Sequence, residues 1–252
     1  MKKFEKKEAT LYKADALEFL STLEDNSVDL IITDPAYSGM NNHLKLGKGR
    51  IVGDYKKSKN DKWFTEFTDS IESYTVFLDN CKRVLKQDSH IFVMFDSFSL
   101  ISLAQTFREI FNLKNIITWD KVNIGMGHYF RRRSEFILFG SKGKKRVSSR
   151  RIPDIWEIPR IHKSQYPTEK PVKLFEAMIK SSKIETDKEF LVCDPFFGSG
   201  SSAIASLRNN CSFIGCDISD KAFKLSKSRI NEFYKEGFDK ELISDDKFWI
   251  GK

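Results

Sequence analysis

The chain has 252 residues, of which 40% are hydrophobic and 13% aromatic, so it is long enough to bury a substantial core within one domain. Its 43 Lys and Arg residues outnumber 35 Asp and Glu residues, and the net charge of +8 favours polyanionic partners without specifying one. No run approaches the roughly 18 apolar residues that a membrane span requires, and the charged N-terminal residues lack the apolar core of a signal peptide. We therefore expect a cytoplasmic protein with no membrane association.

The secondary structure expected from the sequence alternates between strands and helices. Short apolar, β-branched runs predict strands at 11–14, 28–33, 90–95, 115–119, 135–139, 190–193 and 212–216. Apolar residues at helical spacing predict helices at 71–85, 100–111, 171–181, 201–208 and 221–234. Because several strands are apolar throughout, we expect helices on both faces of a mostly parallel sheet. The predicted fold is a doubly wound α/β domain that spans residues 1–252.

Two basic stretches interrupt this alternation. The segments 38–67 and 141–165 are predicted to be extended surface insertions, and long loops of this kind are often functional. Ordinary solvated loops are the competing interpretation. A run of three arginines also precedes the strand predicted at 135–139, and a solvated charge run explains it equally well. The candidates for binding the phosphates of a polyanionic partner are Lys45, Lys48, Arg50, Arg131, Arg132, Arg133, Arg150 and Arg151.

The four cysteines and four histidines carry no recognisable metal-binding pattern. No two cysteines form a Cys-x-x-Cys pair, and the histidines lack the spacing of metal ligands. Three of the cysteines lie in apolar runs. We therefore expect reduced, buried thiols and no metal site.

A glycine-rich turn indicates a nucleoside-binding half. The strand predicted at 190–193 runs into Asp194-Pro195-Phe196-Phe197-Gly198-Ser199-Gly200, and a helix begins near Ser201. The glycines permit a tight turn and close approach of the backbone to a ligand. The next strand ends at Asp217, where a carboxylate can accept hydrogen bonds from ribose hydroxyls. The pattern fits NAD as well as S-adenosylmethionine. It is not a P-loop, because no lysine follows the glycines.

A second motif follows the strand predicted at 28–33. This strand stops at Asp34-Pro35-Ala36-Tyr37, and the carboxyl ends of parallel strands are where α/β sheets bind ligands. Pro35 stiffens the turn, and Tyr37 offers a flat face for stacking. Taken alone, the motif is better explained as a turn with a capping carboxylate and a core tyrosine.

Together these motifs resemble those of the S-adenosylmethionine-dependent amino-methyltransferases that modify adenine N6 or cytosine N4 in DNA. Asp34–Tyr37 resembles their catalytic Asp-Pro-Pro-Tyr motif, and the glycine segment is similar to their cofactor motif. Residues 166–171, Tyr-Pro-Thr-Glu-Lys-Pro, resemble the segment found before the cofactor strand. The catalytic motif precedes the cofactor motif, which is the circularly permuted order of the β class. Two positions depart from the family pattern: Ala36 replaces a proline and Tyr166 replaces a histidine.

The resemblance implies a Rossmann-like fold and a role for each matched residue. Asp34, Pro35, Ala36 and Tyr37 are expected to hold and stack a flipped base. The residues expected to bind S-adenosylmethionine are Asp15, Ala16, Thr168, Lys170, Asp194, Phe196, Phe197, Gly198, Ser199, Gly200 and Asp217. Adenine N6 is the favoured target, because an aspartate at the start of the catalytic motif leans towards adenine in this family.

The partners follow from the same resemblance. We expect double-stranded DNA as the substrate, and a homodimer and a cognate restriction endonuclease are possible partners. Four alternatives stay open from the sequence: cytosine N4 methylation, an RNA amino-methyltransferase, an NAD-dependent oxidoreductase, and a catalytically weakened DNA-binding relative that has lost the second proline of its catalytic motif.

Overall fold

The computed structural model describes residues 1–35, 70–125, 129–162, 164, 166, 169–185 and 187–235. The predicted site residues that lie outside these ranges are Ala36, Tyr37, Lys45, Lys48, Arg50 and Thr168, and the whole of the segment 38–67 also lies outside them.

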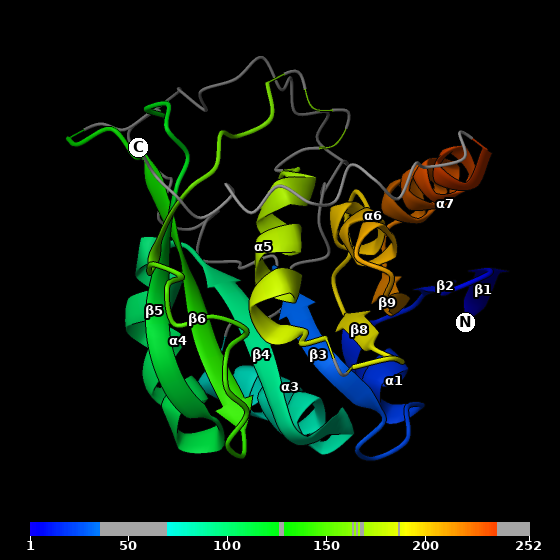
Figure 1. Cartoon of the computed structure of the whole chain (residues 1–252), viewed down its shortest axis with the longest axis horizontal. Helices are drawn as coiled ribbons and strands as arrows, with labels where there is room; N and C mark the ends of the chain where they lie inside the picture. The colour runs from blue at the N-terminus through cyan, green and yellow to red at the C-terminus, as the bar shows by residue number, and fades with distance from the viewer. Residues whose placement is uncertain are drawn as a thin grey trace.

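The described residues form one large sheet in the order β1-β2-β9-β8-β3-β4-β6-β5-β7 (Figure 1). Pairing is parallel from β2 to β4, whereas β1 and β6 run antiparallel to their neighbours. The strands are β1 (Lys2–Lys6), β2 (Ala9–Lys13), β3 (Val28–Thr33), β4 (Leu85–Phe95), β5 (Asn112–Asp120), β6 (Ser134–Lys142), β7 (Ile155–Glu157), β8 (Leu191–Asp194) and β9 (Ser212–Asp217).

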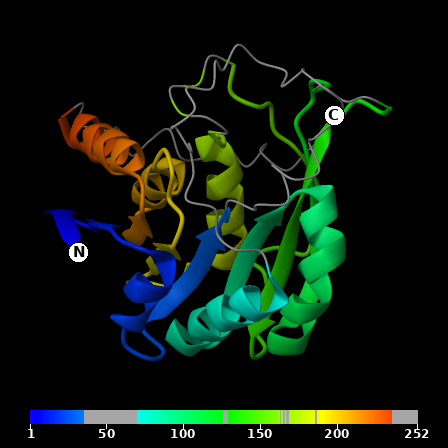
Figure 2. The same ribbon diagram turned by 180° about the vertical axis from the view of Figure 1, so that it is seen from behind.

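Helices cover both faces of this sheet, as the uniformly apolar strands predict. Those on one face are α5 (Val172–Ser182), α6 (Ser201–Arg208) and α7 (Asp220–Lys235), and those on the other are α1 (Ala16–Ser21), α3 (Ile71–Val84) and α4 (Ser97–Ile110) (Figures 1 and 2). Two separate clusters of buried side chains correspond to these two faces. The predicted doubly wound α/β fold is confirmed.

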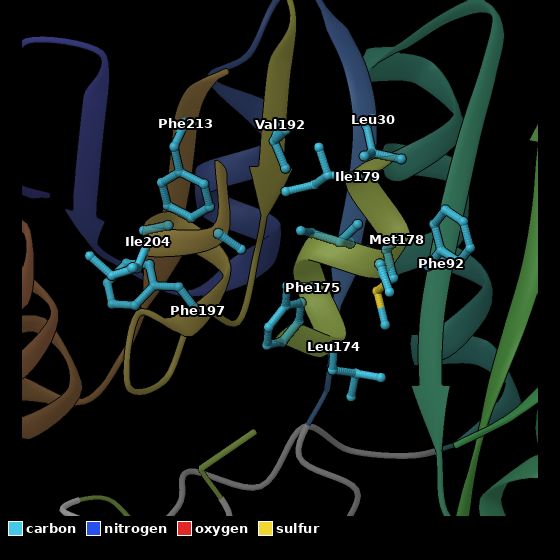
Figure 3. Close-up of a cluster of buried hydrophobic side chains, with 14 of the residues drawn as sticks. Leu30, Phe92, Leu174, Phe175, Met178, Ile179, Val192, Phe197, Ile204 and Phe213 are labelled. Atoms are coloured by element: carbon cyan, nitrogen blue, oxygen red, sulfur yellow. The ribbon is translucent and has the colours of Figure 1, made fainter. Parts of the chain in front are cut away.

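The α5 helix is the centre of the larger cluster. Leu174, Phe175, Met178 and Ile179 follow helical spacing and are at most 4% exposed. Figure 3 shows Ile179 between Val192 and Leu30, and Met178 on the side of Phe92, so the helix packs against β8, β3 and β4. The packing fixes the start of α5, and with it the preceding residues 169–171, over the carboxyl end of β3.

Several elements differ from those predicted. The strands β1 and β7 and the helix α1 were not predicted, because each is short and two of them carry more charged or exposed positions than apolar ones. The segment 141–165 is not a continuous surface insertion: Ser141 and Lys142 complete β6, and β7 buries Trp156 against the core. Its indole Nε1 donates to the carbonyl of Pro153 at 2.9 Å.

All four cysteines are free and buried, as predicted. Burial raises the pKa of Cys211 to about 11, and the thiols of Cys81, Cys193 and Cys216 shift in the same direction for the same reason. These thiols are therefore protonated at neutral pH and belong to the core.

The sheet reverses its strand order between β8 and β3. From β3 the chain proceeds to β4 on one side, whereas from β8 it proceeds to β9 on the other. Because Ile31 pairs with Cys193, Asp34, which follows β3, and Pro195-Phe196, which follow β8, leave the same edge of the sheet side by side. Ligands of open α/β sheets bind at such a switch point. Both predicted motifs therefore meet at one place.

Candidate active site

Asp34 follows the last residue of β3 at the switch point. Its carboxylate side chain is 27% exposed and contacts the ammonium of Lys170 through Oδ2. Lys170 comes from the segment just before α5, and its own side chain is 12% exposed. An ion pair that is this sheltered from water is screened much less than one on the surface.

Two further charged residues extend this ion pair into a chain of alternating charges. Glu135, at the start of β6, places Oε2 at 3.6 Å from Nζ of Lys170. Its other oxygen, Oε1, accepts from Nζ of Lys121 at 3.1 Å. The order is therefore Lys121, Glu135, Lys170 and Asp34. Neither Lys121 nor Glu135 was among the predicted site residues, because no local motif marks them and only the pairing of β4, β5 and β6 brings them to the site.

The charges of the chain shift one another's pKa values. Burial raises the pKa of Asp34, Lys170 opposes this rise, and Glu135 adds to it. Burial also disfavours the charge of Lys170, but Asp34 and Glu135 outweigh it, so the pKa of Lys170 is raised overall. The pKa of Glu135 is lowered, because Lys170 and Lys121 together outweigh its burial. Lys170 is therefore a permanent cation held between two carboxylates.

The position of Lys170 differs from the one expected from the resemblance. It was predicted among the cofactor-binding residues, but its ammonium lies with Asp34 and Glu135. The reason is geometric: residues 169–171 pass over the end of β3 on their way into α5, so the side chain extends towards that strand.

The glycine turn between β8 and α6 has the conformation that the sequence predicts. Gly198 and Gly200 have φ angles of +50° and +81°, in the left-handed region that favours glycine. The backbone N–H of Gly198 donates to Oδ2 of Asp217 at 2.9 Å. The carboxylate of Asp217, at the end of β9, is only partly buried, and its oxygens retain lone pairs for ribose hydroxyls.

The helix α7 holds the turn in place from the other side. Ser226 Oγ donates to the carbonyl of Gly198 at 3.0 Å, and Arg229 Nη1 donates to the carbonyl of Ser199 at 3.0 Å. Arg229 also pairs with Glu169 at 2.9 Å and so connects the turn to the residue next to Lys170. Neither α7 residue was among the predicted site residues, because a serine and an arginine on an amphipathic helix carry no signal of their own.

Replacing Gly200 with alanine is expected to disrupt this turn. The added Cβ would lie 2.7 Å from Ser226 Oγ and 3.1 Å from its Cα, at a φ angle that strains alanine. We expect a loss of about 1–3 kcal/mol in stability and weaker binding of S-adenosylmethionine, measured by thermal unfolding and calorimetric titration. Gly143→Ala is the matched control, because Gly143 also has a left-handed φ of +86° but follows β6 at the opposite edge of the sheet. It is expected to lose stability without losing affinity.

The remaining predicted cofactor residues gather around the turn. Asp15 caps α1 by accepting from the N–H of Leu17 at 2.8 Å, and the pairing of Lys13 with Asp217 brings it beside the end of β9. Ala16 is buried in the first turn of α1. Phe197 is 3% exposed and belongs to the core rather than to an open surface.

Asp194 and Phe196 form the start of the turn. The N–H of Phe196 donates to Asp194 Oδ1 at 2.9 Å, and the Phe196 ring packs edge-on against Phe77. Burial raises the pKa of Asp194 to about 7, although this hydrogen bond opposes the rise. Asp194 is 1% exposed, so its role in the described structure is to shape the turn.

Tyr166, which departs from the family pattern, borders the same turn. Its ring would lie 3.5 Å from a Cβ placed on Gly198. Burial and the nearby charge of Asp217 raise the pKa of Tyr166 to about 12, so the phenol stays protonated. The ring therefore offers an uncharged wall next to the predicted ribose site.

The three consecutive arginines occupy different environments. Arg133 makes a two-pronged ion pair with Asp120, with both N···O distances at 2.6 Å. Arg131 donates from Nε to the carbonyl of Gly125 at 2.9 Å, and Arg132 lies over the ring of Phe98 at 5.2 Å from its centroid. The run is therefore not three equivalent phosphate-binding groups, since Arg133 braces the connection between β5 and β6.

The basic residues of the segment 141–165 are also divided. Lys142 donates to the carbonyls of Lys82 and Leu85 at 2.7 Å each, at the amino end of β4 and away from Asp34. Arg150 and Arg151 are exposed on the connection to β7. Only the last part of the segment returns to the carboxyl edge, where Arg160 Nη1 would lie 3.9 Å from a Cβ placed on Gly125.

Comparison with known proteins settles the family. Residues 28–228 match the sequence model of a family described as DNA methylase, whose members modify N6 of adenine or N4 of cytosine. The chain belongs to this family. The type II methyltransferase M2.MboI of Moraxella bovis is 30% identical over 90% of this chain and 89% of its own length. M2.DpnII of Streptococcus pneumoniae is 26% identical over 90% of this chain and 91% of its own.

Solved structures support the fold. The PvuII DNA methyltransferase, described as cytosine-N4-specific, matches with a TM-score of 0.68 at 17% identity and covers 97% of this chain and 93% of its own. The complex of M1.HpyAVI with S-adenosylmethionine matches with a TM-score of 0.59 at 22% identity, over 88% and 99%.

These findings confirm the main predictions from sequence. The protein is an S-adenosylmethionine-dependent DNA amino-methyltransferase with a Rossmann-like fold. Membership of the family selects S-adenosylmethionine over NAD as the cofactor. Among the residues that the structure describes, no helix is long and apolar enough to span a membrane. No group of three or more His, Cys, Asp or Glu side chains in those same ranges could hold a metal ion.

Proposed function

We propose that the protein methylates N6 of adenine in duplex DNA, with Asp34 as the group that orients the amine. The observation that carries this proposal is the position of Asp34. Its carboxylate is held by Lys170 at the switch point, beside the glycine turn.

The chemistry requires a carboxylate at this place. The lone pair of an adenine amine is delocalised into the ring, so the amine is a poor nucleophile. Asp34 and the carbonyl of Pro35 each accept one amine hydrogen, which favours a pyramidal nitrogen with its lone pair directed away from them. Alignment of this kind supplies a large part of the rate enhancement.

The proposed cofactor site is the glycine turn, which leaves the sheet beside Asp34. Bound S-adenosylmethionine would supply its sulfonium methyl group as the electrophile, with the sulfur as the leaving group, and the amine would release a proton to Asp34 or to solvent. Asp217 would hold the ribose, and the turn from Gly198 to Gly200 would contact the methionine part. Asp15 and Ala16 would border the adenine ring.

The proposed DNA-binding face is the carboxyl edge of the sheet, which surrounds Asp34. Arg131, Arg132 and Arg160 lie at this edge, on the connection between β5 and β6 and on the segment after β7. Their guanidinium groups suit the phosphate backbone. Lys142 is excluded from this role by its position at the opposite edge.

A pair of arginine variants tests whether Arg132 binds DNA phosphates and Arg133 stabilises the fold. Arg132→Ala is expected to weaken binding on all DNA sequences and to reduce the slope of log K against log salt by about 1. Arg133→Ala is expected to lower thermal stability instead, because it breaks the ion pair with Asp120 while leaving the salt slope unchanged. Both are measured by fluorescence anisotropy over a salt series. Equal slopes for Arg132→Ala and the unmodified protein would contradict the assignment.

The finer points remain proposals. Asp34 favours adenine over cytosine, because an aspartate at the start of the catalytic motif leans towards adenine in this family. Membership of a DNA methylase family favours DNA over RNA as the substrate. The similarity to type II methyltransferases supports a role beside a cognate restriction endonuclease in the cytoplasm. A homodimer remains a prediction that sedimentation analysis can test.

The experiment that tests the proposed function is methyl transfer from labelled S-adenosylmethionine to unmethylated genomic DNA, with RNA as the competing substrate. We expect label in DNA and none in RNA. Label in RNA alone would overturn the choice of substrate. Absence of transfer to either, with S-adenosylmethionine bound, would favour the catalytically weakened relative.

A further inference from the structure

The connection between β5 and β6 presents an exposed aromatic pair. Tyr129 and Phe130 are 88% and 93% exposed, which makes them the two most exposed large apolar side chains among the described residues. Isolated exposed apolar residues are ordinary, whereas contiguous exposed apolar side chains rimmed by polar residues mark interaction sites.

Backbone hydrogen bonds hold the part of this connection that adjoins the two strands. The N–H of Lys121 donates to the carbonyl of Arg133 at 2.9 Å, and the N–H of Gly125 donates to the carbonyl of Arg132 at 2.7 Å. These bonds continue the pairing of β5 with β6 beyond the strand ends, and the ion pair of Arg133 with Asp120 closes it. On the β6 side, the aromatic pair is therefore followed directly by residues that backbone hydrogen bonds hold in place.

The chain leads from the aromatic pair directly into the residues that surround Asp34. Phe130 precedes Glu135 by five residues, and Glu135 contacts Lys170, which holds Asp34. An extended chain of five residues spans at most about 18 Å, so Phe130 lies within that distance of Glu135 along the backbone. Arg131 and Arg132 stand between them and supply positive charge for a phosphate backbone.

We propose that Phe130, with Tyr129, is a wedge that inserts between base pairs beside the target base and helps it leave the duplex. This proposal rests on the proposed function. Proteins that distort DNA insert apolar side chains between base steps, and an aromatic ring can stack on the bases that extrusion exposes. The flanking arginines make duplex DNA the occupant that fits best, rather than the apolar face of a protein partner.

The test compares Phe130→Ala with the unmodified protein on two duplexes that carry the methylation site, identified by sequencing methylated DNA. In one the target base is paired, and in the other it faces an abasic position, which lowers the cost of extrusion. We expect Phe130→Ala to lose about tenfold or more in kcat/KM on the paired duplex. On the duplex with the abasic position it should stay within about threefold of the unmodified protein.

Controls separate the wedge from other roles. Phe130→Trp keeps a flat ring and is expected to retain activity. Ile184→Ala removes another exposed apolar residue, which lies after α5 at the opposite edge, and is expected to leave activity unchanged. Equal losses on both duplexes, or no loss on the paired one, would overturn the proposal. So would a change in oligomeric state, which would assign the pair to a protein interface. Absence of transfer by the unmodified protein to either duplex would instead overturn the proposed function.

Discussion

Asp34→Asn is expected to lower kcat by on the order of 10³-fold while leaving the affinity for S-adenosylmethionine within about threefold of the unmodified protein. Asparagine preserves the shape of the side chain but removes its charge and replaces one acceptor with a donor. Lys170 is expected to keep the asparagine oxygen as its partner, so the NH2 group, a donor, faces the amine of the base in place of an acceptor. Single-turnover transfer of a labelled methyl group measures the effect, and calorimetry measures the affinity.

The control for this variant lies on the same strand. Asp29 is near the amino end of β3, where its carboxylate pairs with Lys86 at 2.8 Å. Asp29→Asn therefore removes the same charge from the same strand and also breaks an ion pair, but at the edge away from the site. We expect it to keep full activity. A loss in Asp34→Asn no larger than that in Asp29→Asn would show that Asp34 has only a structural role.

The second large effect is expected for Lys170→Met. Its ammonium is the cation that Asp34 contacts, and removing it leaves Asp34 and Glu135 close together without the charge between them. Breaking a buried pair by removing one partner costs about 3–5 kcal/mol, because the other charge stays behind. We expect kcat to fall by on the order of 10²-fold and the thermal unfolding temperature to fall with it.

The pH profile distinguishes this role from general loss of structure. Asp34 accepts an amine hydrogen only as a carboxylate, so activity falls as the pH drops through its pKa. Burial raises that pKa and Lys170 opposes the rise. Without Lys170 the pKa rises further, so the acid limb of the kcat profile should move to higher pH. Lys86→Met, which breaks the pair with Asp29, should leave the limb in place. A uniform loss at every pH would contradict the electrostatic role of Lys170.

Much of the fold could be predicted because its signals are local. The strand β3 and the helix α6 have the predicted bounds, since each is a run of apolar residues with a clear stop. The strands β1 and β7 escaped prediction because their stability comes from pairing with β2 and β5 rather than from their own apolar residues.

The same difference between local and long-range signals applies to the candidate site residues. The turn at Gly198 and Gly200 could be predicted, because a glycine turn between a strand and a helix has a sequence pattern that its geometry requires, and the positive φ angles confirm that geometry. The cofactor-binding roles of these glycines and of Asp217 stay predictions. Glu135 and Arg229 were missed, because their roles depend on partners far away in the chain: Lys170 for one, Glu169 and Ser199 for the other. No local pattern encodes such a pairing.

The roles of the basic residues also depend on contacts that the local sequence does not show. Charge alone placed Arg131, Arg132 and Arg133 together as phosphate-binding candidates. The structure separates them, because Arg133 pairs with Asp120 whereas Arg132 lies over Phe98. A run of like charges in a sequence therefore indicates a basic surface, but the neighbours of each side chain determine which of them are available to a partner.

The central claim is that Asp34 directs methyl transfer to the exocyclic amine of adenine. The most direct measurement is digestion of the methylated DNA to nucleosides and mass analysis with a standard for each methylated base. We predict N6-methyladenine as the product, formed by the unmodified protein and not by Asp34→Asn. N4-methylcytosine would contradict the choice of base, and a methyl group on a ring carbon would contradict the role given to Asp34.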